Sequence, residues 1–269
     1  MKLANQAEIP ALGLGVYKMA AGAEMNAAVG AAYAAGYRLF DTAQMYGNEA
    51  ALGAALQANG IPRKEVFLIS KVDNGNQWYQ PTLDSFEQSL ERLQTDYLDA
   101  FLVHWPGQDK ARTLSTWQAM EKLYEDGKVR SIGVCNFEQP QLEYLLSHCQ
   151  VAPMLDQIEH TPLQHNRALL DYCGEKNIRV MAWAPLLRGD FDHPVIQNLA
   201  RKYGKTPAQI LLRWNVQQGI IPIPKSKNPT RLAENIAVFD FALEGEDMAA
   251  LGGMNQNRRT SRDPLIFDF

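Results

Sequence analysis

Eight short apolar runs alternate with longer stretches of helical periodicity along the whole 269-residue chain. The runs lie at residues 12–15, 37–42, 66–71, 97–105, 130–137, 153–159, 178–185 and 220–226. Such alternation is typical of parallel strands joined by crossover helices. Because no linker interrupts the pattern, we expect one α/β domain over residues 1–269, folded as a closed (β/α)8 TIM barrel.

An open, doubly wound sheet is the other fold compatible with this alternation. That fold usually carries G-x-G-x-x-G after its first strand, where the glycines let the backbone approach a dinucleotide. Here Gly13 and Gly15 are followed by Val16, Tyr17 and Lys18, so the fingerprint is absent. The barrel is therefore the favoured fold.

Helix signals between the apolar runs support the same reading. In the stretch 81–93, apolar residues at 83, 86, 90 and 93 fall on one helical face. In the stretch 205–214, Thr206 and Gln209 have the spacing of a capping box, and Pro207 stands at the first helical position. A helix is expected in each stretch.

Composition and charge exclude several classes of function. The net charge is −4 and no basic run is present, which argues against nucleic acid and acidic membranes as partners. No apolar run is long enough to span a bilayer, and MKLANQAEIP lacks the apolar core of a signal peptide. The three cysteines, Cys135, Cys149 and Cys173, have no metal-ligand spacing. We expect reduced thiols, no metal site and a cytoplasmic location.

Polar and aromatic residues stand where the expected strands end. These residues are Asp41, Lys71, His104, Cys135–Asn136, Gln157–Glu159, Trp183 and Lys225–Ser226. Taken singly, each has an ordinary structural explanation: Lys71 as a solvated lysine, His104 as a satisfied core histidine, Asp41 as a helix cap. Because the carboxyl ends of barrel strands meet at one mouth, we expect these side chains to converge on one site.

Long motifs along the chain resemble the aldo-keto reductase family in the family's order. They are GLGVYK (13–18), YRLFDTAQMYGNE (37–49), LISK (68–71), DYLDAFLVHWP (96–106), GKVRSIGVCNF (127–137), DQIEHTP (156–162), WAPL (183–186) and IPIPKSKNPTRLAEN (221–235). Within the family the chain looks most like the short prokaryotic members typified by 2,5-diketo-D-gluconate reductase.

The resemblance implies reduction of a carbonyl by hydride from NADPH, with the proton supplied by Tyr46. By the same resemblance, Lys71 lowers the pKa of that tyrosine, which is normally about 10. Asp41 keeps Lys71 charged and in place. His104 orients the substrate oxygen, so that Tyr46 and His104 stabilise the developing negative charge.

The resemblance also implies the cofactor contacts. Asn136 and Gln157 are expected to hold the nicotinamide carboxamide and Trp183 to stack on its ring, with further contacts from Asp41, Ala184 and Leu186. Asn228 and Pro229 read as the start of a helix. At that start Lys225, Ser226 and Arg231 are expected to bind the 2′-phosphate of NADPH, and Glu234 and Asn235 the adenine.

The substrate pocket is less well defined by the motifs. The resemblance implies contacts from Tyr17, Tyr46, His104 and Trp105. The chain departs from the family at Asp73, where relatives usually carry tryptophan, and at Cys135, where they usually carry serine. Asp73 would repel anionic substrates, whereas the arginines of segment 257–269 would attract them if that segment folds over the mouth. The sequence leaves both effects open.

Two other functions remain compatible with a barrel of this kind. One is a non-catalytic relative that binds NADPH as a regulatory subunit. The other is a Schiff-base aldolase using Lys71, which requires a lysine with a strongly lowered pKa. Asp41 beside Lys71 favours the opposite shift. We expect a monomeric carbonyl reductase acting on a small-molecule substrate.

Overall fold

The computed structural model describes all residues from Met1 to Phe269 and contains one eight-stranded parallel sheet. Its strands pair in chain order: β1 (Leu14–Gly15), β2 (Leu39–Asp41), β3 (Phe67–Val72), β4 (Ala100–Val103), β5 (Ile132–Cys135), β6 (Leu155–Glu159), β7 (Arg179–Trp183) and β8 (Ile221–Pro222). Each coincides with one of the eight apolar runs, with β3 extending one residue beyond its run to Val72. Backbone N–H groups of Gly13 and Gly15 donate to the carbonyls of Pro222 and Pro224 at 3.0 and 3.1 Å, which joins the two edges. The expected (β/α)8 barrel is confirmed.

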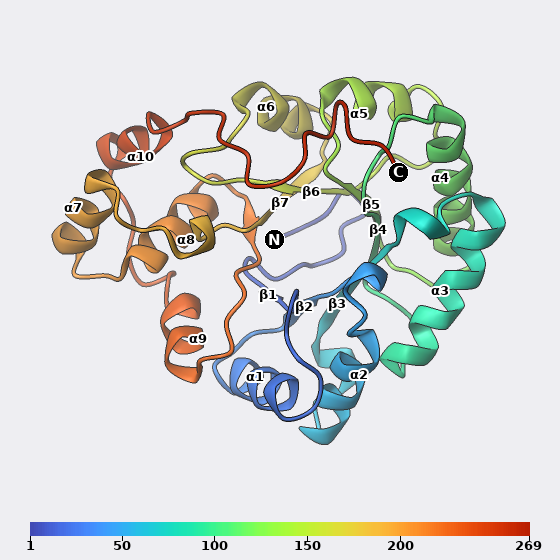
Figure 1. Ribbon diagram of the computed structural model, residues 1–269, viewed down its shortest axis with the longest axis horizontal. Coiled ribbons are helices and arrows are strands. Elements are labelled where there is room, and N and C mark those ends of the chain that lie inside the picture. The colour runs from blue at the N-terminus through green and yellow to red at the C-terminus, as the bar shows by residue number, and fades with distance from the viewer.

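Helices surround the strands on the outside (Figure 1). They are α1 (Ala23–Ala34), α2 (Glu49–Ala58), α3 (Tyr79–Leu93), α4 (Lys110–Glu125), α5 (Gln139–Leu146), α6 (Arg167–Glu175), α7 (Pro194–Tyr203), α8 (Pro207–Gln217), α9 (Pro229–Ile236) and α10 (Gly245–Gly252). Four short 3-10 turns lie in the connections between strands and helices: η1 (Gln44–Tyr46), η2 (Arg63–Glu65), η3 (Asn74–Asn76) and η4 (Leu187–Gly189). No helix is both long enough and apolar enough to cross a bilayer.

The helix signals of the sequence are found at their expected places. Phe86, Leu90 and Leu93 are buried on the inner face of α3. Thr206 and Gln209 form a reciprocal capping box at the start of α8. The Asn228 side chain caps α9 by accepting a hydrogen bond from the Arg231 N–H at 3.1 Å. These local interactions need only neighbouring residues, which is why the sequence predicted them.

The barrel interior follows from the two-residue period of strands. One apolar cluster contains inward residues of six strands together with Leu3 and Ile9 of the N-terminal segment: Leu39, Phe67, Ile69, Ala100, Leu102, Leu155, Met181 and Ile221. Lys71 continues the face of Phe67 and Ile69, and Gln157 continues that of Leu155. The same alternation therefore gives the barrel an apolar interior and a polar uppermost layer at its carboxyl end.

Close strand packing requires glycine within β5. A Cβ atom on Gly133 would lie 2.6 Å from the carbonyl oxygen of Leu155 on β6, inside the van der Waals limit. Gly133 thus lets β5 and β6 approach below the layer that carries Cys135 and Gln157.

The C-terminal segment (residues 255–269) follows α10 and crosses in front of β6 and β5 toward α4 (Figure 1). Glu159, the last residue of β6, accepts hydrogen bonds from the Thr260 N–H at 2.9 and 3.1 Å and from its hydroxyl. Arg259 pairs with Glu138, and Arg112 of α4 pairs with Asp268 at 3.0 Å. The segment therefore lies over the mouth, one of the two possibilities that the sequence left open.

Candidate active site

A buried ion pair forms the centre of the site. The Lys71 ammonium donates to both carboxylate oxygens of Asp41 at 2.8 and 2.9 Å and to the Thr42 carbonyl at 2.9 Å. Both side chains are essentially inaccessible to solvent. Burial is the largest single effect and would lower the pKa of Lys71, but its neighbours, Asp41 foremost, together raise that pKa above its ordinary value. Lys71 therefore carries its charge, which opposes the Schiff-base chemistry that an aldolase needs.

Tyr46 lies above this pair, on η1 in the loop after β2. Its hydroxyl is 3.5 Å from the Lys71 Nζ, and its ring contacts the rings of Tyr17 and His104 with centroid distances of 4.8 and 5.7 Å. Burial raises the pKa of Tyr46, and the Lys71 charge opposes the rise without cancelling it. The expected downward effect of Lys71 is present, but the expected net lowering is wrong because desolvation of the phenolate is the larger effect. Tyr46 is held in its protonated form.

His104 follows β4 and faces the same space. Its Nδ1 is buried without a hydrogen-bond partner. Burial, assisted by the Lys71 charge, lowers the pKa of His104 to about 3. A neutral imidazole has one N–H donor, so His104 has the protonation state needed to donate a hydrogen bond to a carbonyl oxygen.

Amide and indole groups lie beside the ion pair. The Gln157 Nε2 donates to Asp41 Oδ2 at 2.8 Å, and its Oε1 has only the Cys135 thiol, at 3.9 Å, as a partner. The half-buried Trp183 donates its indole N–H to the Asn136 Oδ1 at 2.9 Å. The Asn136 Nδ2 donates to the His104 carbonyl at 3.0 Å and contacts the Cys135 Sγ at 3.2 Å. Acceptor oxygens of Asn136 and Gln157 thus retain capacity for a further donor.

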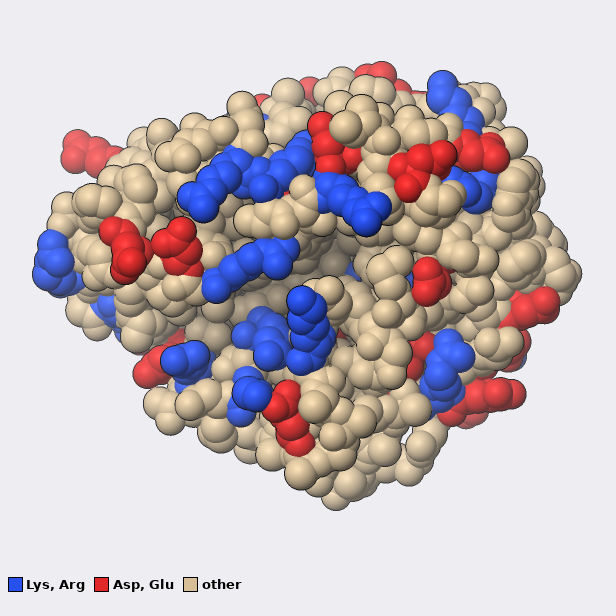
Figure 2. Space-filling model, viewed as in Figure 1, with Lys and Arg blue, Asp and Glu red and all other residues tan.

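The connection from β8 to α9 carries the other expected cofactor residues. Lys225 and Arg231 are exposed, whereas Ser226 and Asn235 are buried and Glu234 is half-buried. The Ser226 hydroxyl accepts from the Asn228 N–H at 3.2 Å, which fixes the turn before α9. Figure 2 shows Lys and Arg side chains gathered around the hollow at the centre of this face. The exposed cations Lys225 and Arg231 at the start of α9 make this edge suitable for a phosphate.

The loop after β7 follows Trp183, which lies beside Asn136, and precedes the helices that lead to the start of α9. Ala184, Leu187 and Arg188 have φ values of 51°, 51° and 55°, a left-handed conformation that is uncommon outside glycine. The Arg188 guanidinium donates to the Thr260 carbonyl at 3.1 Å, which links this loop to the C-terminal segment. Strained backbone of this kind clusters at ligand clamps.

A nicotinamide dinucleotide fits these residues. The Gln157 Oε1 can accept a further hydrogen bond, which suits the carboxamide N–H₂ of the nicotinamide. The half-buried indole of Trp183 suits stacking on the nicotinamide ring, and the cationic start of α9 suits a phosphate of the dinucleotide. Ala184 and Leu186 lie in the loop between these two ends. The side chains of Tyr17, Trp105 and Tyr46 surround the remaining space near His104.

Three residues near the mouth have roles that the sequence did not predict: Phe267, Arg188 and Glu159, which was expected only as a polar strand end. Phe267 packs edge-on against Trp105 with ring centroids 5.0 Å apart, so the tail adds an apolar wall. Glu159 and Arg188 anchor that tail. The aromatic sequence LIFDF was a signal for Phe267, but the partners of Glu159 and Arg188 lie 101 and 72 residues away along the chain. Trp78, the first tryptophan after Asp73 in the chain, is exposed at the start of α3.

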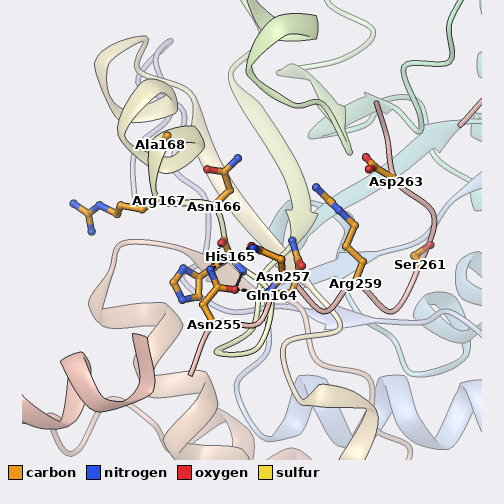
Figure 3. Close-up of a pocket in the computed structure, with 10 residues that line it drawn as sticks. All are labelled: Gln164, His165, Asn166, Arg167, Ala168, Asn255, Asn257, Arg259, Ser261 and Asp263. Atoms are coloured by element: carbon orange, nitrogen blue, oxygen red, sulfur yellow. Dashed lines mark hydrogen bonds between the residues drawn. The ribbon is translucent and has the colours of Figure 1, made fainter. Parts of the chain in front are cut away.

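A polar groove of about 750 Å³ lies apart from these residues, between the start of α6 and the C-terminal segment (Figure 3). None of the four expected catalytic residues lines it. Arg259 is paired with Glu138 and Arg167 with Asp171 at 2.9 Å, and Arg167 points away from the other lining groups (Figure 3). Asn255 holds the loop by bonding to both the N–H and the carbonyl of His165. The groove is the gap between segment 164–168 and the C-terminal segment, and its arginines are already paired.

Comparison with known proteins assigns the family. The model of the aldo/keto reductase family matches residues 11–256. The chain is 45% identical to a glyoxal reductase of Bacillus subtilis over 99% of this chain and 97% of that protein. It resembles the structure of an aldo-keto reductase from a deep-sea metagenome library, with a TM-score of 0.96, 38% identity and full coverage of both chains. It also resembles a Bombyx mori aldo-keto reductase in complex with NADP, with a TM-score of 0.90, 36% identity, and coverage of 97% of this chain and 94% of the other. This chain is an oxidoreductase of the aldo/keto reductase family.

Proposed function

We propose that this protein reduces small aldehydes and ketones to alcohols with NADPH, and that Tyr46 supplies the proton. The observation that carries the proposal is the arrangement of a protonated Tyr46, 3.5 Å from the buried Lys71 ammonium, beside a neutral His104. When bound, the nicotinamide supplies the hydride, which no side chain can provide.

The protein's own groups have complementary roles in this proposal. His104 donates a hydrogen bond to the carbonyl oxygen and orients it toward Tyr46. As negative charge develops on that oxygen, the Tyr46 hydroxyl donates its proton. The Lys71 ammonium stabilises the phenolate that remains, and Asp41 keeps that ammonium charged. Because His104 is neutral and buried, it acts as a fixed dipole while Tyr46 gives up the proton.

Asn136, Gln157 and Trp183 would hold the nicotinamide, and Ala184 and Leu186 would line its path. Lys225, Ser226 and Arg231 would hold the 2′-phosphate that distinguishes NADPH from NADH, with Glu234 and Asn235 at the adenine. The exposed guanidinium of Arg231 at the capped start of α9 supports this assignment. The NADP complex of the Bombyx mori enzyme supports it further.

We propose α-dicarbonyls of the glyoxal and methylglyoxal type as substrates. The Bacillus subtilis relative is named a glyoxal reductase, and the aromatic rings of Tyr17 and Tyr46 pack together beside His104. A keto-sugar acid such as 2,5-diketo-D-gluconate is the second candidate. It is supported by Arg262, whose guanidinium lies 4.4 Å from the centre of the Phe267 ring. The Asp73 carboxylate, which caps η3 by accepting from the Gly75 N–H at 3.4 Å, opposes this candidate.

The proposed form is a cytoplasmic monomer. All proposed catalytic and cofactor groups come from a single chain, and the three cysteines are free thiols, as a reducing compartment favours.

The test is NADPH consumption with a panel of simple aldehydes, α-dicarbonyls and keto-sugar acids, comparing wild type with Tyr46→Phe. We expect turnover to fall by a factor of about 100 or more in the variant, the effect of losing a positioned general acid, while NADPH binding is retained. The ranking within the panel identifies the substrate class. Tight NADPH binding by the wild type without any turnover would instead favour the regulatory relative.

A further inference from the structure

The turn that carries Tyr46 has few ties to the rest of the barrel. Within η1 and its flanks, the Tyr46 N–H donates to Ala43 and the Gly47 N–H to Gln44, both inside the turn. The Tyr46 hydroxyl has one hydrogen-bond contact, the 3.5 Å contact with Lys71. Met45 and Gly47 are exposed. Asn48 anchors the end of the turn by donating to the Val16 carbonyl and accepting from the Thr42 hydroxyl, each at 2.9 Å. Between Ala43 and Gly47, only the side chains of Gln44 and Tyr46 hydrogen-bond to other elements.

The side chain of Gln44 supplies the missing ties. Its Nε2 donates to the Ser85 carbonyl and to the Ser89 hydroxyl, each at 3.0 Å. Its Oε1 accepts from the Asp73 N–H at 2.8 Å and from the Asn76 Nδ2 at 3.0 Å. A carboxamide has two donor hydrogens and two acceptor lone pairs, so all four are used.

These partners lie on the elements that also fix Lys71. Asp73 comes two residues after Lys71, at the end of β3. Ser89 on α3 donates to the buried Glu49 at 3.3 Å, and Glu49 also accepts from the hydroxyl of Ser70, the residue before Lys71. Gln44 therefore joins the loop of the proton donor to the strand of the ammonium by two separate routes, through η3 and through α3.

We infer that Gln44 is a positioning residue for Tyr46, which fixes the distance between the tyrosine hydroxyl and the Lys71 ammonium. The inference rests on the proton-donor role proposed above for Tyr46. Misplacement of a reacting group by about 1 Å costs about 100-fold in rate. Loss of the four hydrogen bonds is therefore expected to slow the chemical step while leaving the cofactor residues, which apart from Asp41 lie on β5 to α9, in place.

The principal variant is Gln44→Met, which keeps the length of the side chain and removes its hydrogen bonds. The matched control is Gln217→Met on α8. Gln217 is also half-buried and also uses both ends of its carboxamide, accepting from the Leu243 N–H at 2.6 Å and donating to the Leu243 carbonyl at 3.0 Å. Both variants leave a backbone N–H without its partner, so they are matched for the general cost of such a change.

In the kinetic test, Gln44→Met is expected to lower kcat about 10- to 100-fold with the NADPH dissociation constant changed less than about twofold. Gln217→Met is expected to retain the wild-type kcat. In a Tyr46→Phe background, Gln44→Met should cause no further loss in single-turnover rate, because its effect passes through Tyr46. An unchanged kcat, or an equal loss in both backgrounds, overturns the inference.

Amide hydrogen exchange tests the same inference without turnover. In Gln44→Met, the amides of residues 45–48 are expected to exchange at least about tenfold faster than in wild type, and in Gln217→Met they are expected to be unchanged. Suppose that exchange is faster in Gln44→Met but the wild type has no reductase activity. That result would support the positioning of the turn by Gln44 and refute the proposed function. Unchanged exchange in Gln44→Met overturns the inference that Gln44 positions the turn, whether or not the enzyme is active.

Discussion

At the scale of single residues, the behaviour of each ionisable group depends on how far it is from water and on which charge it meets. Lys71 and Asp41 are both buried, yet the ion pair keeps the lysine charged. Tyr46 meets the same ammonium, yet burial has the larger effect and keeps the phenol protonated. The ammonium and phenol thus stay in the two protonation states that proton donation requires.

Removing the lysine leaves a buried carboxylate without its partner. We expect Lys71→Met to lower the free energy of unfolding by about 3 kcal/mol, the usual cost of breaking a buried pair from one side. Urea unfolding measures this loss. The double variant Asp41→Asn/Lys71→Met, which removes both charges, should be more stable than Lys71→Met alone. A double variant that is less stable would show that the unpaired carboxylate is not the cause.

At the scale of elements, the residues of the candidate site are distributed over different loops. The β2–α2 connection carries Tyr46, the β7–α7 connection carries the strained Ala184 and Arg188, and the start of α9 carries Arg231. The C-terminal segment contacts the β7–α7 connection at Arg188, the end of β6 at Glu159 and the β4–α4 connection at Trp105. Because these loops have different contacts, we expect a mutation in one loop to affect its own proposed role and leave the roles of the others unchanged.

The start of α9 provides a test of that separation. Arg231→Ala should raise the dissociation constant of NADPH about tenfold or more, since a charge-assisted contact with a phosphate is lost, and that of NADH much less. Fluorescence titration with each cofactor measures both values. Arg201→Ala on α7, which removes another exposed arginine, serves as the control. Equal losses for the two cofactors in Arg231→Ala would refute the phosphate assignment.

At the scale of the whole molecule, buried histidines link folding to pH. Burial lowers the pKa of His104 to about 3 and that of His160, which stacks on Trp214, to about 4. Both values lie below the ordinary value near 6.5, so the unfolded chain binds more protons at mildly acidic pH. The contribution of the two histidines to stability is therefore complete above about pH 6.5 and is lost as the pH falls toward their folded values.

We expect the two histidines together to remove about 4 to 5 kcal/mol of stability between pH 6.5 and 4.5, because each group approaches a loss of about 1.4 kcal/mol per pH unit only once the pH is well below 6.5. Asp156 acts in the opposite direction, because burial raises its pKa. The measurement is therefore the difference between wild type and the variant His104→Gln/His160→Gln in urea unfolding across this range. Parallel pH profiles for the two proteins would contradict the assignment.

The sequence by itself determined the features that depend on near neighbours and on periodicity. Eight apolar runs with intervening helices, and no dinucleotide fingerprint after the first run, favoured the barrel over an open doubly wound sheet. The capping box of α8 and the cap of α9 are local, and the polar strand ends follow from the rule that barrel strands share one carboxyl end. The predicted positions of Asp41, Lys71 and His104 follow from these facts.

Tertiary structure alone decided what depends on distance through space. The net direction of the Tyr46 pKa is a balance between desolvation and one ammonium, and neither quantity can be read from spacing. The course of the C-terminal segment depends on Glu159 meeting Thr260, 101 residues away. Gln44 gains its proposed role because Ser85, Ser89, Asp73 and Asn76 surround it in the folded chain, where each contributes one bond to a carboxamide that looks unremarkable in the sequence.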